Sequence, residues 1–499
     1  MRTNVGDWIA AGILTVAITA VHFNSPIVTI SDATWNLFTS FSILESGDTD
    51  LNEFEAFLKE RDYWGIHRAG DRLLNYFPIG PSLFALPFLA ASKQLPGGWM
   101  FFNLHGWTER DATGNWQIFI ASCSVAFSGG LFYIIARRFG LRWLPALAIT
   151  LLFAFGTSLY STASRALWQH GPSVVVLCAT LLAFQKLDWL DRVRDRGWHA
   201  GNAAFYGLLV VTGLLLGMAY LMRPTNAIPA VLLSGFVLVR YRLGVVPFLI
   251  GTALIAGPYL AYNQAIYADW FPPYSQASRV GGWNSFWTAL PANLFSPARG
   301  LLVFSPIVGL SVVGLILLLR QGRLRLFELT LLACMLLHVL VISRFEHWWL
   351  GHSYGPRGMT DILPFLFWFL LPVLGAVDFA GRARTAGRMV LLALLTITGL
   401  WSVDVHWRGA NKVSVLFWNV HPVNVDAHPE RIHDWSDPLF LRDRARYLRN
   451  PTSAGLAVSM RCTAVFRWIL LLHPFRSTRP SDCCPISNAT RPCRTSRFR

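Results

Sequence analysis

Long apolar runs with few charges constrain the fold of this chain more than any other feature. Several of them reach the roughly 17–25 residues that a membrane-crossing helix needs. The chain is 54% hydrophobic and only 14% charged, whereas soluble proteins are about one quarter charged. We therefore predict an all-α polytopic membrane protein. Its eleven predicted spans lie at about residues 8–23, 116–136, 143–160, 172–185, 203–222, 226–239, 243–262, 300–319, 326–343, 360–378 and 387–403.

A twelfth apolar segment, 77–91, carries three prolines. Proline removes backbone donors and bends helices, so we predict a re-entrant or surface-lying segment rather than a span. Five basic loops then fall on one side of the membrane, which basic residues identify as the cytoplasmic side. These loops are 136–142, 185–196, 240–242, 320–325 and 381–388. The prediction is a plasma-membrane protein with a cytoplasmic N-terminus and an external C-terminus. The first run lacks a small-residue cleavage site and is interpreted as an uncleaved anchor.

The chain divides into three predicted regions. Residues 1–405 form the transmembrane domain with a long external loop at 24–115, residues 406–450 a short external segment, and residues 451–499 a basic, unstructured tail. The net charge of +16 does not indicate nucleic-acid binding, because the tail holds eight arginines and one acid and the other basic residues lie mainly in short loops. The seven cysteines show neither a disulfide framework nor zinc spacing. No metal site is predicted.

The first external loop is rich in carboxylates between residues 26 and 58. Asp32 follows the first span closely, where a carboxylate could act as a general base on an acceptor hydroxyl. The alternative from spacing is that Asp32 caps a helix beginning near Ala33. Further along, apolar residues between 51 and 58 share one face of a helix. They predict a short amphipathic helix lying on the membrane.

A second group of polar residues lies at 343–361, in the sequence SRFEHWWLGHSYGPRGMTD. Arg357 has a planar fork suited to phosphate oxygens, and His352 could add a donor. A structural salt bridge is the alternative for Arg357. Three glycines around Pro356 indicate a tight, closely approaching backbone. Elsewhere, His170 and Asp269 are weaker external candidates.

The spans themselves are nearly bare of charge. Ion-coupled transporters place ionisable residues at mid-membrane and often show paired broken helices. Neither is visible, which disfavours a pump or a symporter.

Four segments in a fixed order resemble bacterial membrane glycosyltransferases of the GT-C superfamily, in the branch similar to dolichyl-phosphate-mannose protein mannosyltransferases. They are ISDATWNLFTSFSI, NYFPIGPSLFALPF, LFSPARGLLVFSP and GHSYGPRGMTDILPF. The resemblance spans roughly residues 8–445. It implies inverting sugar transfer from a polyprenyl-phosphate donor on the external face, with Asp32 as the base. The family often has a paired acidic motif at this point, whereas Asp32 is followed by Ala33; metal dependence is therefore left open.

The resulting prediction is a membrane glycosyltransferase whose partners are a polyprenyl-phosphate-sugar lipid, an unknown acceptor and membrane lipids, with no cofactor. Arg357, His352 and His170 are predicted to contact the donor phosphate. Trp35, Tyr354 and Asp269 are predicted to contact substrate. The segment 77–91 is predicted to shape the lipid entrance. Two alternatives remain: a non-enzymatic lipid-carrier flippase or cell-envelope assembly scaffold, and a GT-C fold that binds without catalysis.

Overall fold

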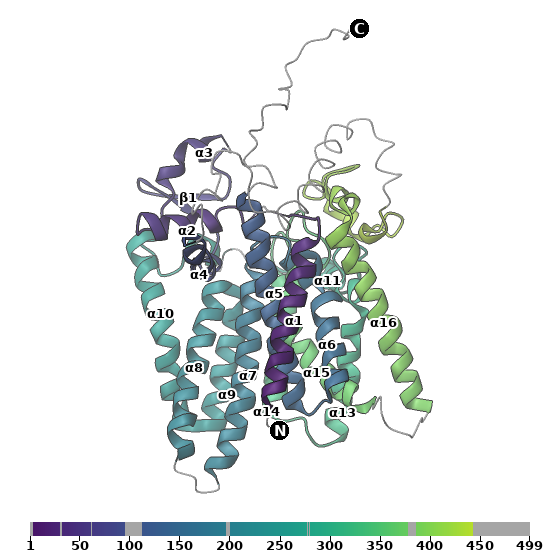
Figure 1. Ribbon diagram of the computed structural model, residues 1–499. Coiled ribbons are helices and arrows are strands. Elements are labelled where there is room, and N and C mark those ends of the chain that lie inside the picture. The colour runs from purple at the N-terminus through teal and green to yellow at the C-terminus, as the bar shows by residue number, and fades with distance from the viewer. Residues whose placement is uncertain are drawn as a thin grey trace, which may run out of the picture. The chain divides into compact units, whose positions relative to one another are not determined.

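The computed structural model describes residues 3–29, 32–60, 62–94, 112–195, 200–276, 278, 280–377 and 386–442. Within these ranges the regular secondary structure is helical apart from one hairpin (Figure 1). The predicted tail at 451–499 lies outside the described residues. The α-helices are α1 Val5–Asn24, α2 Asn36–Glu45, α3 Glu55–Lys59, α4 Gly80–Lys93, α5 Ala112–Phe139, α6 Trp143–Phe155, α7 His170–Arg194, α8 Ala200–Met222, α9 Ala227–Tyr241, α10 Val245–Tyr267, α11 Phe286–Phe295, α12 Leu301–Phe304, α13 Ser311–Arg320, α14 Leu326–Ser343, α15 Leu363–Ala376 and α16 Ala386–Asn411. The strands are β1 Ile66–Ala69 and β2 Arg72–Asn75, and the short helices used below are η1 Asn52–Phe54, η3 Leu159–Ala163, η4 Pro224–Asn226, η8 Pro306–Leu310, η9 Arg357–Ile362, η10 Val413–Asn419, η11 Pro429–His433 and η12 Leu439–Leu441.

Eight helical stretches of the described chain are long and apolar enough to cross a membrane. One of them, Pro224–Tyr267, contains both α9 and α10, and two shorter apolar helices lie at Trp143–Phe155 and Pro306–Arg320. The polytopic all-α fold is confirmed, while the count of eleven spans stays a prediction. At 14 residues, α4 covers most of the proline-containing segment and is shorter than a span requires.

The most buried of these helices are α5, α7 and α15, whose side chains form the main apolar core. Close helix contacts depend on glycine. A Cβ at Gly213 of α8 would overlap the backbone oxygen of Phe248 of α10, and one at Gly314 of α13 would overlap that of Phe369 of α15. By contrast, α1 exposes Ile13 and α16 exposes Leu400 by about two thirds. Such faces suit contact with lipid.

Two predicted spans are shorter than expected, for local reasons. The run at 143–160 ends as α6 at Phe155, because Gly156 is the C-cap and the chain then turns into η3. The run at 300–319 is divided into α12, η8 and α13, because Pro306 cannot continue the hydrogen bonding of the preceding helix.

The first long loop folds into a small cluster of elements, at the upper left of Figure 1 above α10. The amphipathic pattern near residues 51–58 forms η1 and α3. Its apolar side packs inside the protein and not on lipid, a correction to the sequence prediction: Leu51 and Leu58 are fully buried with Trp35 and Phe38. The antiparallel hairpin β1–β2 was not predicted.

After α16 the chain continues in three short helices, η10, η11 and η12. They carry Trp418 and Ile432 into a second apolar cluster with Phe304 and Tyr354. Arg299 stabilises this region, donating to the backbone oxygens of Trp349 and Gly351 at 3.0 and 2.9 Å and to Asn419 Oδ1 at 2.8 Å. Burial lowers the pKa of Arg299 to about 9, so its guanidinium remains charged at neutral pH.

Candidate active site

One cavity of about 210 Å³ brings Asp32, His170 and Arg357 together, although they are far apart in the sequence. We call it the Asp32 cavity. Its charged and polar side also includes Arg223 and Gln169. Its apolar wall is formed by Ile228, Val341, Phe345 and Leu350. A cavity with one ionic side and one apolar side suits a ligand that is itself amphiphilic.

Asp32 lies in the turn between α1 and α2 and does not cap α2. That helix begins at Asn36, its N-cap is Trp35, and no side chain caps it. The turn is fixed by Gln117 of α5, whose amide donates to the backbone oxygens of Ala33 and Thr34 at 2.9 and 3.2 Å. The helix-cap interpretation of Asp32 is therefore wrong, and its carboxylate faces the cavity.

Arg165 stabilises the segment that leads from α1 to this turn. It is fully buried and donates to the backbone oxygen of Ser25 at 3.1 Å and to that of His22. The backbone of Arg165 also accepts from Thr29 at 3.1 Å. This arginine therefore fixes the end of α1 and the approach to Asp32.

Arg357 begins η9 and lines the cavity beside Asp32. Its Nη2 lies 3.3 Å from Asp32 Oδ2, and its guanidinium carbon lies 4.4 Å from the centre of the Trp168 ring. Its position depends on Gly355, which has φ of +63° and where a Cβ would approach the Phe304 ring to 2.7 Å. The close-approaching backbone predicted from the glycines is confirmed here.

Four polar atoms on cavity-lining residues are buried without a hydrogen-bond partner among the described residues, one of them Ser275 Oγ. The other three are Arg357 Nε, Gln169 Oε1 and Thr225 Oγ1. Buried polar groups in folded proteins are almost always paired, with protein, water or ligand. These atoms supply donors and acceptors that a polar ligand in the cavity would satisfy.

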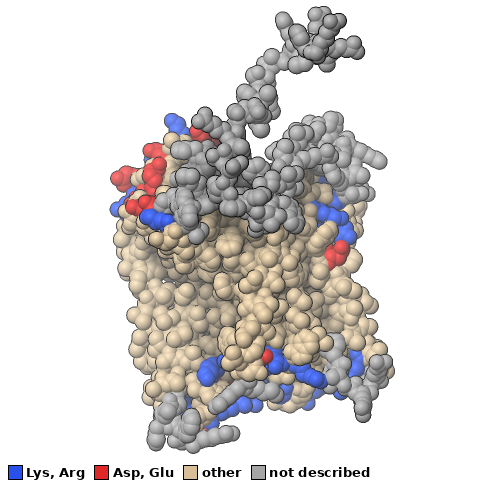
Figure 2. Space-filling view, in the orientation of Figure 1, with Lys and Arg blue, Asp and Glu red and all other residues tan. Residues whose placement is uncertain are grey.

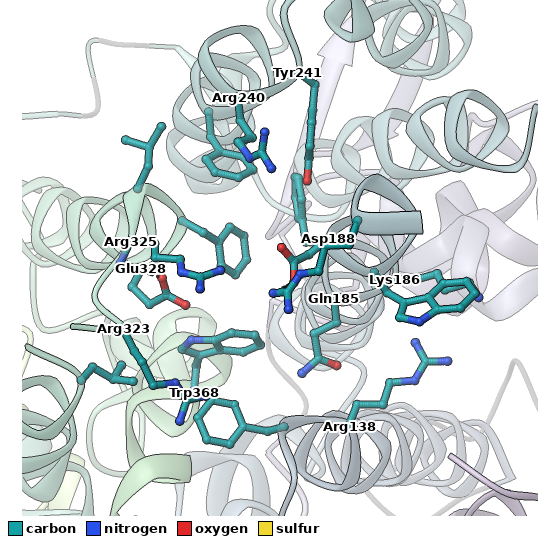
Figure 3. A pocket seen from close by; sticks show the side chains of 18 of the residues that line it. Arg138, Gln185, Lys186, Asp188, Arg240, Tyr241, Arg323, Arg325, Glu328 and Trp368 are labelled. Carbon is teal, nitrogen blue, oxygen red and sulfur yellow. Dashed lines mark hydrogen bonds and ion pairs between the residues drawn. The ribbon is translucent and has the colours of Figure 1, made fainter. Parts of the chain in front are cut away.

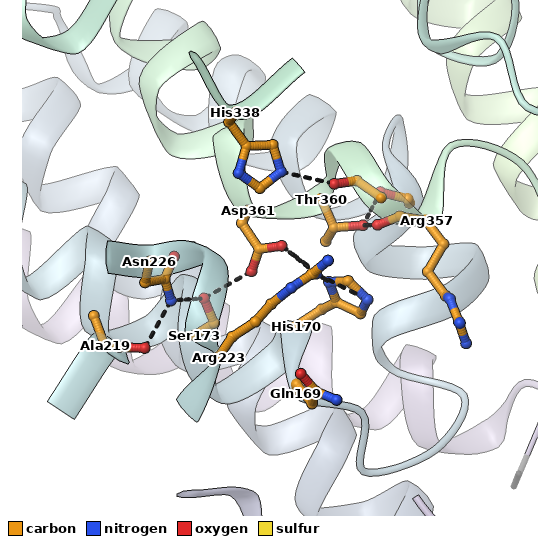
Figure 4. Close-up of polar contacts among 12 residues, drawn as sticks. Gln169, His170, Ser173, Ala219, Arg223, Asn226, His338, Arg357, Thr360 and Asp361 are labelled. Carbon is orange, nitrogen blue, oxygen red and sulfur yellow. Dashed lines mark hydrogen bonds and ion pairs between the residues drawn. The ribbon is translucent and has the colours of Figure 1, made fainter. Parts of the chain in front are cut away.

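A second and more deeply buried ion pair, of Arg223 with Asp361, adjoins the cavity, and Figure 4 draws its contacts. Asp361 accepts from Arg223, from His170 at 3.1 Å and from Ser173 Oγ at 2.7 Å. Asn226 donates in turn to Ser173 Oγ at 2.8 Å. The sequence alone assigned no role to Arg223 or Asp361. The signal that could have found them is an ionisable residue at the end of an apolar span.

His170 lines the cavity, as a phosphate contact would require, but its imidazole is already held by Asp361 and Arg223. It begins α7 and is 5% exposed. In this structure His170 therefore positions the ion pair of Arg223 and Asp361.

The four other predicted site residues lie away from the Asp32 cavity. His352 contacts Asn424 at 2.9 Å and Asp426 at 3.3 Å, and Asp269 is exposed and accepts from the backbone of Phe271. The remaining two are buried aromatic residues: Trp35 donates to the backbone oxygen of Trp64 at 2.8 Å, and Tyr354 to that of Val405 at 2.7 Å. Burial raises the pKa of Tyr354 well above its ordinary value, so its hydroxyl stays neutral.

Among the described residues, no group of three or more His, Cys, Asp or Glu side chains is placed to hold a metal ion. The cavity's own lining contains a single carboxylate, that of Asp32. Among the described residues of this site, the positive charge therefore comes from the arginines of the lining, Arg223 and Arg357.

No family model and no curated protein matches the chain. Among solved structures, it is similar to ArnT from Cupriavidus metallidurans bound to undecaprenyl phosphate, with 16% identity and a TM-score of 0.46 over 83% of this chain and 69% of that chain. The apo state of the same protein gives 15% identity and a TM-score of 0.43 over 82% and 79%. The likeness is too distant for any residue's role to be carried over.

Proposed function

We propose that this protein is a membrane glycosyltransferase that transfers a sugar from a polyprenyl-phosphate-linked donor to an acceptor. The observation that carries the proposal is the contact of 3.3 Å between Asp32 and Arg357 in a cavity with an apolar wall. The resemblance of the sequence to GT-C glycosyltransferases supports the same chemistry. By the positive-inside rule, the Asp32 cavity lies on the external face.

Arg357 is the proposed donor ligand. Its fork suits two phosphate oxygens, and its buried Nε lacks a partner among the described residues. Trp168 supports the guanidinium from one side, and the apolar wall accommodates the first part of the prenyl chain. When phosphate engages Arg357, the contact with Asp32 is weakened and that carboxylate becomes available to the acceptor.

Asp32 is the proposed general base. The acceptor's nucleophilic atom attacks the anomeric carbon as its proton passes to Asp32, while the bond from that carbon to the phosphate oxygen breaks. Polyprenyl phosphate leaves with the electron pair, and Arg357 stabilises the charge on it. With one carboxylate in the cavity lining and no second one to act as nucleophile, a single displacement inverts the configuration.

The proposed test measures transfer from radiolabelled polyprenyl-phosphate sugars to membrane acceptors, with purified protein. Wild type is compared with Asp32→Asn and with Asp48→Asn, the same change at an exposed position of the same loop. Wild type and Asp48→Asn are expected to transfer label, and Asp32→Asn to lose about 10²–10⁴-fold in rate. Absence of transfer from every donor would favour a carrier-lipid flippase, which a flipping assay would then test.

A further inference from the structure

A second and larger cavity lies at the other end of the helical bundle, where α1 begins. It has a volume of about 870 Å³ and is lined by residues from Thr3 and Trp8 through α5, α7 and α9 to α14 and α15. Helix α7 connects the two sites: His170 at its start lines the Asp32 cavity, and Lys186 and Arg192 near its end line this one. We call it the basic cavity.

The lining of the basic cavity carries an excess of positive charge. Six of its side chains are basic and two are acidic. The basic ones are Arg138, Lys186, Arg192, Arg240, Arg323 and Arg325. Figure 3 shows several of these side chains arranged around one space, and Figure 2 shows blue side chains gathered along the same end of the molecule.

The two acidic residues of the lining are already engaged. Asp188 pairs with Arg192, one turn along α7. Glu328 accepts from the backbone nitrogen of Arg325 at 3.1 Å, at the start of α14. With both carboxylates counted, the lining still has four more basic than acidic side chains.

Three of the arginines form no salt bridge with any described carboxylate. They are Arg138 at the end of α5, Arg323 between α13 and α14, and Arg325 just before α14. Arg323 lies over the Phe139 ring at 5.2 Å, a contact that holds its guanidinium without cancelling its charge.

Membrane topology accounts for basic residues at this end of the bundle, but it does not account for their convergence on one cavity. The four segments that supply them, the ends of α5, α7 and α9 and the turn before α14, are separated in the sequence and meet here. Aromatic and aliphatic walls lie beside them, from Phe139, Phe184, Phe327, Trp368 and Leu318. Trp8 and Leu326 of the same lining are 46% and 42% exposed, which gives the cavity an apolar rim.

We propose that the basic cavity binds a phosphate-bearing anion, for which a membrane lipid headgroup and a free phosphate compound are the two sources. Basic pockets between transmembrane helices are suited to anionic headgroups. The volume is that of a small-molecule site and greatly exceeds what one phosphate needs. The apolar rim would accept the first part of a lipid chain. This site is separate from the Asp32 cavity, and the proposal does not depend on the glycosyltransferase activity.

The test uses the full-length purified protein and native mass spectrometry, which counts bound ligands directly. The probes are phosphatidylglycerol, undecaprenyl phosphate and inorganic phosphate, with phosphatidylcholine as the zwitterionic comparison. The test variant combines Arg138→Gln and Arg325→Gln. The matched control is Arg320→Gln, which removes an exposed basic residue at the same end of the bundle but outside the cavity lining.

At about fivefold per cation, the double variant is expected to bind its phosphate-bearing ligand some 25-fold more weakly, and Arg320→Gln as wild type does. The probe whose binding falls identifies the source: a phospholipid, the prenyl carrier or free phosphate. Equal binding of all probes by wild type and the double variant would overturn the proposal. An equal loss in Arg320→Gln would also overturn it, because it would show attraction to the whole basic end. Thermal melting of each variant establishes that the protein is folded in every comparison.

Discussion

Two arginine–carboxylate pairs lie within the same small region and are built differently. Arg223 and Asp361 are 7% and 2% exposed at their side chains, and Asp361 has further partners in His170 and Ser173. Arg357 and Asp32 are 11% and 25% exposed and meet at 3.3 Å through one nitrogen. The first pair is held by its own network and only its arginine lines the cavity, whereas both partners of the second pair line it. The difference indicates that the deeper pair, Arg223 with Asp361, stabilises the structure around the site. The outer pair, Arg357 with Asp32, is available to a substrate.

The largest expected effect on stability comes from breaking the deeper pair. In Asp361→Asn, the Arg223 guanidinium stays buried without its carboxylate, a change that typically costs about 3–5 kcal/mol. Thermal melting in detergent should show a large drop. Replacing both partners with apolar residues, as in Arg223→Met with Asp361→Leu, should recover part of it. A melting temperature unchanged in Asp361→Asn would show that this pair does not hold the fold.

The next largest effect is expected at Arg357, where a substitution should weaken binding of the donor. Arg357→Lys keeps the charge but loses the planar fork. Donor affinity should fall by about 10- to 100-fold, which corresponds to the roughly 1.5–3 kcal/mol of a hydrogen bond to a charged group. Titration of a polyprenyl-phosphate sugar measures it. Arg408→Lys, an arginine paired with Asp404 outside the cavity, is the control. Equal affinities in Arg357→Lys and wild type would argue against Arg357 as the phosphate ligand.

A still smaller loss of donor affinity is expected when Trp168 is changed, because its ring only lies against Arg357. Trp168→Leu removes a cation–π contact of about 0.5–1 kcal/mol. Donor affinity should fall only a few-fold, and Trp168→Tyr should restore part of the loss. A loss as large as that of Arg357→Lys would mean that the indole itself contacts the donor.

The smallest stability effect is expected at Asp32. A partly exposed ion pair contributes about 0–1 kcal/mol, so Asp32→Asn should melt close to wild type. Measured beside Asp361→Asn, it directly compares the two pairs. Should Asp32→Asn unfold as readily as Asp361→Asn, the outer pair would be structural as well.

The sequence predicted the all-helical membrane fold, because long apolar runs have few other solutions. It also singled out Asp32 and Arg357, which stand 325 positions apart. It did not find the pair between Arg223 and Asp361, because charges at span ends are also expected from topology alone. Gly70 and Asp71, which connect β1 to β2, were the available signal for the hairpin.

The remaining predicted residues show where sequence patterns are ambiguous. Trp35 and Tyr354 were predicted to contact substrate, yet both lie in apolar clusters with their polar atoms satisfied by backbone oxygens. An aromatic residue near a polar motif has the same pattern whether it packs in a core or faces a ligand. His352 and Asp269 are polar residues of external loops, and only the folded path of those loops separates them from the Asp32 cavity.

The most direct test of the central claim measures donor binding and single-turnover transfer in the same preparations of wild type, Asp32→Asn and Arg357→Met. If Asp32 is the base and Arg357 the phosphate ligand, Asp32→Asn will bind donor at least as well as wild type but lose about 10²–10⁴-fold in turnover, whereas Arg357→Met will lose donor binding. Turnover by Asp32→Asn at the wild-type rate would contradict the account.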